Sequence, residues 1–328
     1  MRALMARTHG GPEVLEIADV APPEPAEDQL LVRVELAGLN FSDIDHRRGE
    51  RGTPVPMILG TEGSGRVVQT GGLTEGFAVG DRVVWWLPGT PSSCAELAAI
   101  PAARAILVPD GFDPKVAVAL MLQGITAHAL VFPIAGIEPG ESVLVHSGAG
   151  GVGHLAVQLA RLAGAETIIA TASPEKFGFL DELGVDCAVD YHSDDWDARV
   201  LAASDGGVDV VLDGIGNSTL PGSIASCRRR GRCILYGYKS GGHAGGLATA
   251  FDTGLLGRGT VFLTTGVSFL YVRDRAALTD RVGKLFDLYR EGGLKVNIGG
   301  VYGLDEAAAA HRALEGGTSR GKLLVELA

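Results

Sequence analysis

Residues 142–153 read SVLVHSGAGGVG, and this segment determines the architecture of the chain. Its apolar beginning predicts a short buried strand. Gly148, Gly150 and Gly153 follow at the spacing G-x-G-x-x-G, and residues 152–163 then place leucines on one face of a predicted helix. In that setting the first glycine permits a tight turn, the second lets a pyrophosphate approach the backbone, and the third lets helix and strand pack closely. The pattern predicts a dinucleotide site, with a plain tight turn as the alternative.

Strands and helices alternate after this loop. Short apolar runs separated by helical patterns occur at residues 167–170, 187–190, 208–212 and 232–235. Strands joined by helices of this length predict parallel βαβ units, with both faces of one sheet covered. The chain is therefore expected to contain a doubly wound α/β domain.

The chain before this domain has a different pattern. Up to about residue 110 it shows short strands separated by turns, such as 30–37 and 81–86, which predicts a β-rich domain. Residues 114–132 have apolar positions at helical spacing and predict a connecting helix. The glycine-rich residues 241–259 are expected to form either a mobile loop near the dinucleotide or an irregular connection.

The end of the second predicted strand bears on the choice of cofactor. Residues 170–176 read ATASPEK, so no acid stands at the strand tip to bind a ribose 2′-hydroxyl, as an NAD site requires. Ser173 can donate a hydrogen bond, and Lys176 offers a positive charge to a 2′-phosphate. Glu175 is the contrary sign. The residues favour NADPH over NADH, with a solvated helix start as the alternative.

Composition excludes several classes of protein. The 328 residues carry a net charge of −11, which argues against a nucleic-acid surface. Four cysteines are scattered without a C-x-x-C pair, so neither a zinc site nor a disulfide scaffold is expected. No signal-peptide core and no run of 18 apolar residues is present. We expect a soluble, cytoplasmic protein without a membrane partner.

Several segments together resemble a known family. They are residues 37–43 (AGLNFSD), 59–65 (LGTEGSG), 123–127 (QGITA), 213–216 (DGIG) and 235–237 (LYG), besides the glycine loop. With them the chain resembles the zinc-free quinone oxidoreductase (zeta-crystallin-like) branch of the medium-chain dehydrogenase/reductase superfamily. The resemblance implies an α/β fold: a GroES-like β-rich catalytic domain from residues 1–122 and 263–328, and a Rossmann domain with a doubly wound parallel sheet from residues 123–262. It also implies a homodimer.

The resemblance bears on metal use. Zinc-dependent relatives have a cysteine and a histidine where this chain has Asn40 and Thr61, so no metal is expected. An alcohol dehydrogenase uses zinc to stabilise an alkoxide, whereas a quinone or enone spreads negative charge through conjugation. The residues therefore favour a reductase of conjugated carbonyl compounds.

The resemblance also implies site residues. Asn40 and Thr126 are expected beside the nicotinamide, and Asp45 occupies a position where many relatives have a proton-donating tyrosine. An ionised Asp45 would repel an enolate, so it must be protonated, turned away or otherwise engaged. The proton source then stays open between water and His46, although a surface position is the favoured expectation for His46. The residues implied to bind cofactor are Gly148, Gly150, Gly151, Val152, Gly153, Ser173, Lys176, Tyr191, Tyr236, Gly237 and Ser240.

These expectations converge on an NADPH-dependent quinone oxidoreductase that transfers a hydride to a quinone or an α,β-unsaturated carbonyl compound. Two alternatives stay open at this point. One is an enoyl-thioester reductase of lipid or polyketide type, and the other is a non-catalytic NADPH-binding protein of crystallin-like or regulatory kind. A shared fold does not decide among them.

Overall fold

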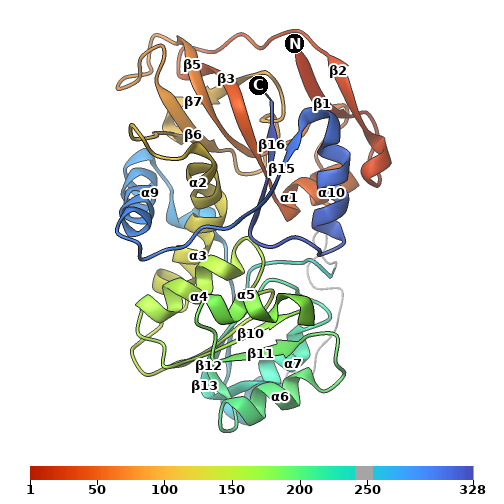
Figure 1. The fold of residues 1–328 in the computed structure, drawn as a ribbon, viewed down its shortest axis with the longest axis vertical. Coiled ribbons are helices and arrows are strands. Elements are labelled where there is room, and N and C mark those ends of the chain that lie inside the picture. Colours follow the sequence, from red (N-terminus) through yellow and green to blue (C-terminus); the bar gives the residue numbers. More distant parts are fainter. Residues whose placement is uncertain (241–253, 328) are drawn as a thin grey trace. The chain divides into compact units, whose positions relative to one another are not determined.

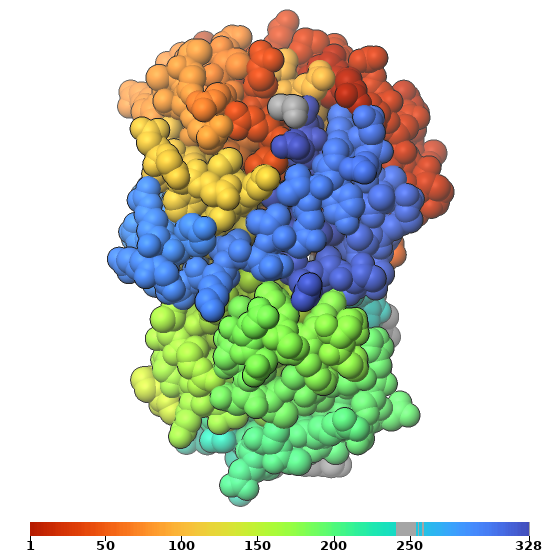
Figure 2. Space-filling view, in the orientation of Figure 1, coloured from red at the N-terminus to blue at the C-terminus, as the bar shows by residue number. Residues whose placement is uncertain are grey.

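The computed structural model describes residues 1–240 and 254–327, which form two compact units. The first unit comprises Met1–Leu122, Val272–Asp287 and Val296–Ala328, and the second comprises Gln123–Tyr271 and Leu288–Lys295. In the space-filling view the N-terminal part (red and orange) and the C-terminal part (blue) share the surface of the first unit (Figure 2). The two ends of the chain therefore fold together.

The first unit is built on two sheets. A seven-stranded sheet has the order β15-β16-β3-β5-β6-β8, with β7 also paired to β3, and a three-stranded sheet has the order β2-β1-β4. Leu30, Val32 and Val34 alternate along β3 and are buried in a core that includes Trp85. The strands are β1 (Arg2–Ala6), β2 (Leu15–Asp19), β3 (Gln29–Leu39), β4 (Met57–Ile58), β5 (Glu62–Thr70), β6 (Arg82–Trp86), β7 (Leu97–Pro101), β8 (Ala105–Leu107), β15 (Ile298–Gly303) and β16 (Lys322–Glu326).

The last strand of the first unit brings the C-terminus to its candidate site. β16 runs antiparallel to β3 with Leu323 opposite Leu39, so Lys322 reaches the level of Asn40 just beyond the end of β3. The helices in or entering this unit are α1 (Phe41–Arg48), α2 (Pro114–Ala119), α9 (Arg275–Arg290) and α10 (Ala307–Glu315).

The second unit is a doubly wound domain around one parallel sheet (Figure 1). Its six strands have the order β11-β10-β9-β12-β13-β14, and all five pairings are parallel. The chain starts at β9, runs outward to β11, and then returns to β12 on the other side of β9. The strands are β9 (Ser142–Val145), β10 (Thr167–Ala172), β11 (Cys187–Asp190), β12 (Val208–Asp213), β13 (Cys227–Leu235) and β14 (Phe262–Thr265).

Helices cover both faces of this sheet. Figure 1 shows α4 and α5 on one side and α6 and α7 on the other. Val200 of α6 and Leu220 and Ile224 of α7 pack into the same core as Leu144 and Val211 of the sheet. The helices of this unit are α3 (Ile125–Ala129), α4 (Gly153–Leu162), α5 (Phe177–Glu182), α6 (Trp196–Ala203), α7 (Leu220–Ala225) and α8 (Gly254–Gly259). The predicted α/β class with a parallel sheet and a β-rich domain is confirmed.

The second unit continues to Tyr271, beyond the expected boundary at residue 262. The reason is strand pairing, since Phe262 of β14 lies beside Arg232 of β13 and Thr265 lies beside Leu235. Of the glycine-rich residues 241–259, residues 241–253 lie outside the described part of the chain, while Gly254–Gly259 form α8.

The predicted connecting helix is longer and less regular than expected. Helical structure runs from Pro114 to Ile134, with π-helical turns at Leu120–Gly124 and Leu130–Ile134. Its length and mean hydropathy of 1.7 would suit a membrane span, but 72% of its most apolar window is buried inside the protein. A core helix has the same composition, so this segment gives only weak support to a membrane association.

Candidate cofactor site and active site

The glycine loop joins β9 to α4 and is shaped by close packing. A Cβ atom on Gly148 would lie 2.7 Å from the Cβ of Ala170, and one on Gly153 would lie 2.1 Å from the carbonyl oxygen of Ser147. Both positions therefore exclude a side chain. The left-handed residue of the turn is Ser147, with φ of 51°. Gly148 contributes to the turn through its lack of a side chain, which allows the loop to pack closely on β10.

The loop lies where a parallel sheet binds ligands. β9 and β12 are neighbours, and the chain order reverses between them, which is the switch point of a doubly wound sheet. Gly150, Gly151 and Val152 are half-buried, so their backbone is within reach of a ligand. α4 begins at Gly153, and the first amides of a helix have no intrahelical acceptor and carry partial positive charge. The arrangement is suited to an anion such as a pyrophosphate.

Ser173 and Glu175 interact just beyond the end of β10. The Ser173 hydroxyl donates a hydrogen bond to the Glu175 carboxylate. This bond is the main reason that the pKa of exposed Glu175 is lowered. Burial raises the pKa of half-buried Tyr191, and the charges of Glu175 and Asp190 raise it further. The predicted residues Ser173 and Tyr191 are therefore in the electrostatic neighbourhood of one carboxylate.

Two lysines interact at the same end of the sheet. Lys176 is buried, and its charge contributes to a lowered pKa of Lys239, for which burial is the larger cause. Two cations that repel each other are stabilised by an anion between them. Lys239 was not predicted from the sequence, because its place next to Lys176 depends on how the chain leaves β13.

Three further predicted residues line the segment after β13. Gly237 packs closely against the backbone of Gly214, since a Cβ there would lie 2.3 Å from the Gly214 carbonyl oxygen. The Ser240 hydroxyl donates to the Ile215 carbonyl oxygen at 2.8 Å. Burial raises the pKa of the Tyr236 hydroxyl, and the charge of Asp213 adds to this effect. These contacts join the segment to the loop after β12.

Thr126 lies on α3 in the second unit and is buried. Its hydroxyl lies 3.0 Å from that of Ser268, and either hydroxyl can be the donor. Because either hydroxyl can donate to the other, the Thr126 hydroxyl can offer a neighbouring group either a hydrogen-bond donor or an acceptor. Ser268 is a partner that the sequence pattern did not indicate.

Asn40, in the first unit, is held by a buried ion pair. Its Nδ2 atom donates to Glu62 at 2.7 Å, and its Oδ1 atom accepts from Lys322 Nζ at 2.9 Å. Lys322 and Glu62 also form a direct ion pair, and neither side chain is exposed. The other Glu62 oxygen accepts the Leu122 amide at 2.9 Å. Glu62 and Lys322 are site residues that sequence analysis missed, because only the pairing of β16 with β3 brings Lys322 to Asn40.

Asp43 adds a second carboxyl group to this cluster. It accepts the Asn40 backbone amide at 2.8 Å and is completely buried. Burial raises its pKa to about 7, and the nearby Glu62 charge adds to the rise, while Lys322 opposes it. Asp43 therefore exchanges its proton near neutral pH.

Asp45 is engaged in an ion pair. Arg51 approaches its carboxylate, with Nη2 at 3.1 Å and Nε at 3.3 Å. Of the three fates predicted for Asp45, this matches assignment to another task. The neighbouring His46 is buried beside the Thr53 hydroxyl, so the expectation of a surface histidine was wrong. The reason is that α1 turns His46 toward the segment around Thr53.

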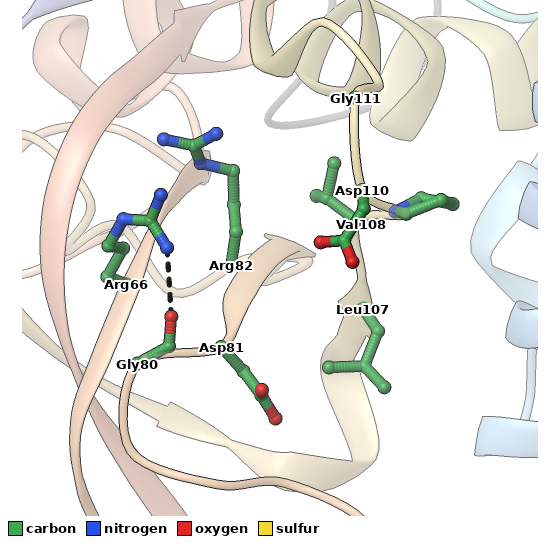
Figure 3. Close-up of a pocket in the computed structure, with 9 residues that line it drawn as sticks. Arg66, Gly80, Asp81, Arg82, Leu107, Val108, Asp110 and Gly111 are labelled. Atoms are coloured by element: carbon green, nitrogen blue, oxygen red, sulfur yellow. Dashed lines mark hydrogen bonds between the residues drawn. The ribbon is translucent and has the colours of Figure 1, made fainter.

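A hollow of about 470 Å³ on the first unit is unrelated to these residues (Figure 3). Arg66 and Arg82 line it, and both form ion pairs with Glu35, at 3.5 Å and 2.9 Å. Arg66 also donates to the Gly80 carbonyl oxygen at 2.9 Å. Both cations already have an anionic partner, and none of the predicted site residues lines the hollow.

The side chains at the two positions that replace zinc ligands are poor donors for zinc. Asn40 and Thr61 supply an amide and a hydroxyl, whereas zinc in proteins prefers thiolate, imidazole and carboxylate ligands. Burial also raises the pKa of the Cys94 thiol, which disfavours its thiolate form. In residues 1–240 and 254–327 no group of three or more His, Cys, Asp or Glu side chains is placed to hold a metal ion.

Comparison with known proteins places this chain among dehydrogenases. The family described as alcohol dehydrogenase GroES-like domain matches residues 26–112, and the zinc-binding dehydrogenase family matches residues 151–278. A quinone oxidoreductase of Pseudomonas aeruginosa is 33% identical, covering 97% of both chains. A 2-haloacrylate reductase of a Burkholderia species is 34% identical, covering 98% of both chains.

A solved structure gives the same result. The quinone oxidoreductase of Escherichia coli, determined in complex with NADPH, is 30% identical and superimposes with a TM-score of 0.90 over 100% of both chains. Both the sequence and the fold are thus shared along the full length. The chain belongs to the zinc-free quinone oxidoreductase branch of the medium-chain dehydrogenase/reductase superfamily.

Proposed function

We propose that this protein is an NADPH-dependent reductase that transfers a hydride to a quinone or an α,β-unsaturated carbonyl compound without a metal. The observation that carries the proposal is the glycine loop at the switch point of a parallel sheet, with no acid at the tip of the second strand and with Lys176 buried just beyond it. Relatives named quinone oxidoreductase and 2-haloacrylate reductase support it, since both of these substrate classes are conjugated.

The described residues fit a bound NADPH. Gly148 and Gly153 add no side chain to the loop, and the half-buried amides of Gly151 and Val152 can donate to a pyrophosphate. The Gly150 amide donates to the Ser147 carbonyl oxygen at 2.8 Å, so we assign Gly150 to the site as the residue that lets the pyrophosphate approach the backbone. We assign Lys176 and Ser173, together with Tyr191, to the 2′-phosphate, and Tyr236, Gly237 and Ser240 to the inner edge of the cofactor. Lys239 joins them because its mutual repulsion with Lys176 favours a bound anion.

When bound, NADPH supplies the hydride. We assign Asn40 and Thr126 to the nicotinamide end, where they orient the ring for transfer. The amide of Asn40 is suited to this task because Glu62 and Lys322 fix which end donates and which accepts. A conjugated acceptor delocalises the negative charge that develops, so hydrogen-bond donors suffice in place of a Lewis acid.

The proton that completes the reduction comes from water in this proposal. Asp45 stands where many relatives have a tyrosine, but its carboxylate is paired with Arg51. An ionised, ion-paired carboxylate is a poor proton donor. Asp45 is then a positioning residue that fixes Arg51, and the reaction does not route a proton through it.

The direct test is oxidation of NADPH, followed at its absorbance band, with a panel of 1,4-quinones, enones, 2-haloacrylates and enoyl thioesters. We expect turnover with quinones or small enones and much lower turnover with long enoyl thioesters. Preference for enoyl thioesters would replace the proposal by an enoyl-thioester reductase. Tight NADPH binding without turnover of any acceptor would indicate a non-catalytic binding protein. Stoichiometric zinc in the purified protein would contradict the metal-free chemistry.

We also propose a cytoplasmic homodimer. β14 pairs with β13 alone among the described strands, and Phe262 on it is 57% exposed. An unpaired strand edge with an exposed aromatic residue favours pairing with a second copy. Light scattering should give a dimer mass for the wild type and a monomer mass for Phe262→Asp. A monomeric wild type would contradict this part of the proposal.

A further inference from the structure

A line of buried polar side chains crosses the sheet of the second unit next to the glycine loop. Thr171 is on β10, His146 directly follows β9, and Asp213 ends β12, so three neighbouring strands contribute. Ser223 comes from α7. None of the four side chains has exposed surface. We call Thr171, His146, Ser223 and Asp213 the His146 relay.

Hydrogen bonds connect the relay from end to end. His146 Nδ1 lies 3.0 Å from the Thr171 hydroxyl, and His146 Nε2 lies 3.0 Å from the Ser223 hydroxyl. The Ser223 hydroxyl donates to Asp213 Oδ2 at 2.7 Å. Burial lowers the pKa of His146, although the Asp213 charge acts in the opposite direction, so the imidazole is neutral at physiological pH.

Only one order of protons satisfies every member. A carboxylate can only accept, so Ser223 donates its single proton to Asp213 and must accept from His146 Nε2–H. A neutral imidazole protonated on Nε2 has a bare Nδ1, which accepts the Thr171 hydroxyl proton. The Thr171 oxygen is then left to accept, and the Ser147 amide lies 3.2 Å from it. The relay is a directed chain from the Ser147 amide to Asp213.

Each end of the relay holds a loop. At one end Thr171 holds the start of the glycine loop, because its carbonyl oxygen also accepts the Gly148 amide at 2.9 Å. At the other end Asp213 Oδ1 accepts the amides of Ile215 and Gly216 at 2.8 Å and 3.0 Å. The two loops leave neighbouring strands on either side of the switch point.

We propose that the His146 relay fixes the spacing of the glycine loop and the loop at residues 214–216, and thereby preorganises both for the cofactor. The inference rests on the proposed function only in naming NADPH as the ligand. The four relay members are positioning residues, since they are buried and act through the backbone amides they hold. A fixed pair of loops binds more tightly because less conformational freedom is lost on binding.

Hydrogen exchange of the protein without ligand tests the coupling between the loops. Ser223→Ala removes the middle of the relay, and amides in residues 147–153 should then exchange several-fold faster. Ser204→Ala is the matched control, because it also deletes a buried hydroxyl of this unit, one that bonds within α6. Unchanged exchange in residues 147–153 with Ser223→Ala, or an equal change with Ser204→Ala, would overturn the proposal.

NADPH affinity tests the consequence. Thr171→Val keeps the shape of the side chain but removes the hydroxyl, and should weaken NADPH binding about fivefold to tenfold, as expected for one lost hydrogen bond. Thr171→Ser restores the hydroxyl and should recover affinity to within about twofold of the wild type. Equal affinity of the wild type and Thr171→Val would contradict the positioning role.

Nitrogen NMR of the histidine side chains tests the proton order. Comparison with His146→Gln assigns the ring, and we expect a protonated Nε2 and a bare Nδ1; the opposite tautomer would refute the relay. This result and the exchange result need no cofactor. If the wild type fails to bind NADPH, the proposed function fails, whereas the relay is still decided by exchange and tautomer.

Discussion

The ammonium group of Lys322 lies 2.9 Å from the amide oxygen of Asn40, and the Glu62 carboxylate accepts from the amide nitrogen at 2.7 Å. The cation therefore faces the acceptor end of the amide and the anion faces its donor end. Because Lys322 and Glu62 are fully buried, solvent does not screen this arrangement. Asn40 is thereby held in one orientation by two charges.

Removing the Lys322 ammonium group should destabilise the folded protein. Lys322→Met leaves the Glu62 carboxylate buried without its cation, and should lower the free energy of unfolding by about 3–5 kcal/mol. Urea unfolding measures this loss. Lys284→Met is the matched control: its ion pair with Asp280 is exposed, so the change should stay within about 0.5 kcal/mol. Similar losses in the two variants would contradict a special role for the buried pair.

Asp43 should make stability fall as pH rises. Its pKa is raised from 3.8 to about 7 in the folded protein, so between these values the folded state keeps a proton that the unfolded state has released. Its contribution to stability is greatest below the unfolded value and declines until the folded value is passed. Asp43→Asn removes this contribution, so its stability relative to the wild type should rise by about 2–3 kcal/mol from about pH 5 to about pH 8.

Urea unfolding of both proteins at the two pH values gives that difference directly. Histidines with lowered pKa, such as His154 and His311, act in the opposite direction in acid but are common to both proteins and cancel. A relative stability that does not change with pH would show that Asp43 is already ionised in the folded protein.

Local pattern was sufficient to predict the glycine loop and its neighbours. The strand before Ser147 and the helix after Val152 follow from apolar spacing over a dozen residues, and the structure has both. The absence of an acid at the tip of β10, where Ala172 and Ser173 stand, is likewise read directly from the sequence. These features depend on residues that are adjacent along the chain.

Features that depend on strand register could not be predicted in this way. Lys322 reaches Asn40 only because Leu323 pairs with Leu39, and nothing near either residue encodes that pairing. The link from His146 to Asp213 likewise needs β9 and β12 to be neighbours. The prediction for His46 was wrong because a polar residue on a short helix gives no sign that the chain folds back over it after the helix, where Thr53 meets the imidazole.

The two lysines beyond β10 and β13 should set cofactor choice. Lys176→Ala should weaken NADPH binding by about tenfold or more and change NADH binding little, because only NADPH carries the 2′-phosphate. Lys239→Ala should have the same direction and a smaller effect, since Lys239 acts together with Lys176. Titration of NADPH fluorescence, repeated with NADH, gives both affinities. Equal losses of NADPH and NADH would contradict the assignment of these lysines.

Adding one methyl group at Gly153 tests whether close packing shapes the glycine loop. Gly153→Ala would place its Cβ 2.1 Å from the Ser147 carbonyl oxygen, a backbone atom that cannot move without the loop. It should lower the free energy of unfolding by about 1–3 kcal/mol and weaken NADPH binding by about tenfold or more. Thermal unfolding with and without NADPH reports both effects.

Gly178→Ala is the control for this change. Gly178 lies within α5 with no atom within 4 Å of an added Cβ, so alanine should be neutral or stabilise the protein by up to about 1 kcal/mol. Each variant adds one methyl group to a helical glycine of the second unit, Gly153 in α4 and Gly178 in α5. Normal NADPH affinity in Gly153→Ala would mean that the loop accommodates a side chain, and the close packing of strand and helix would then not be what shapes the cofactor site.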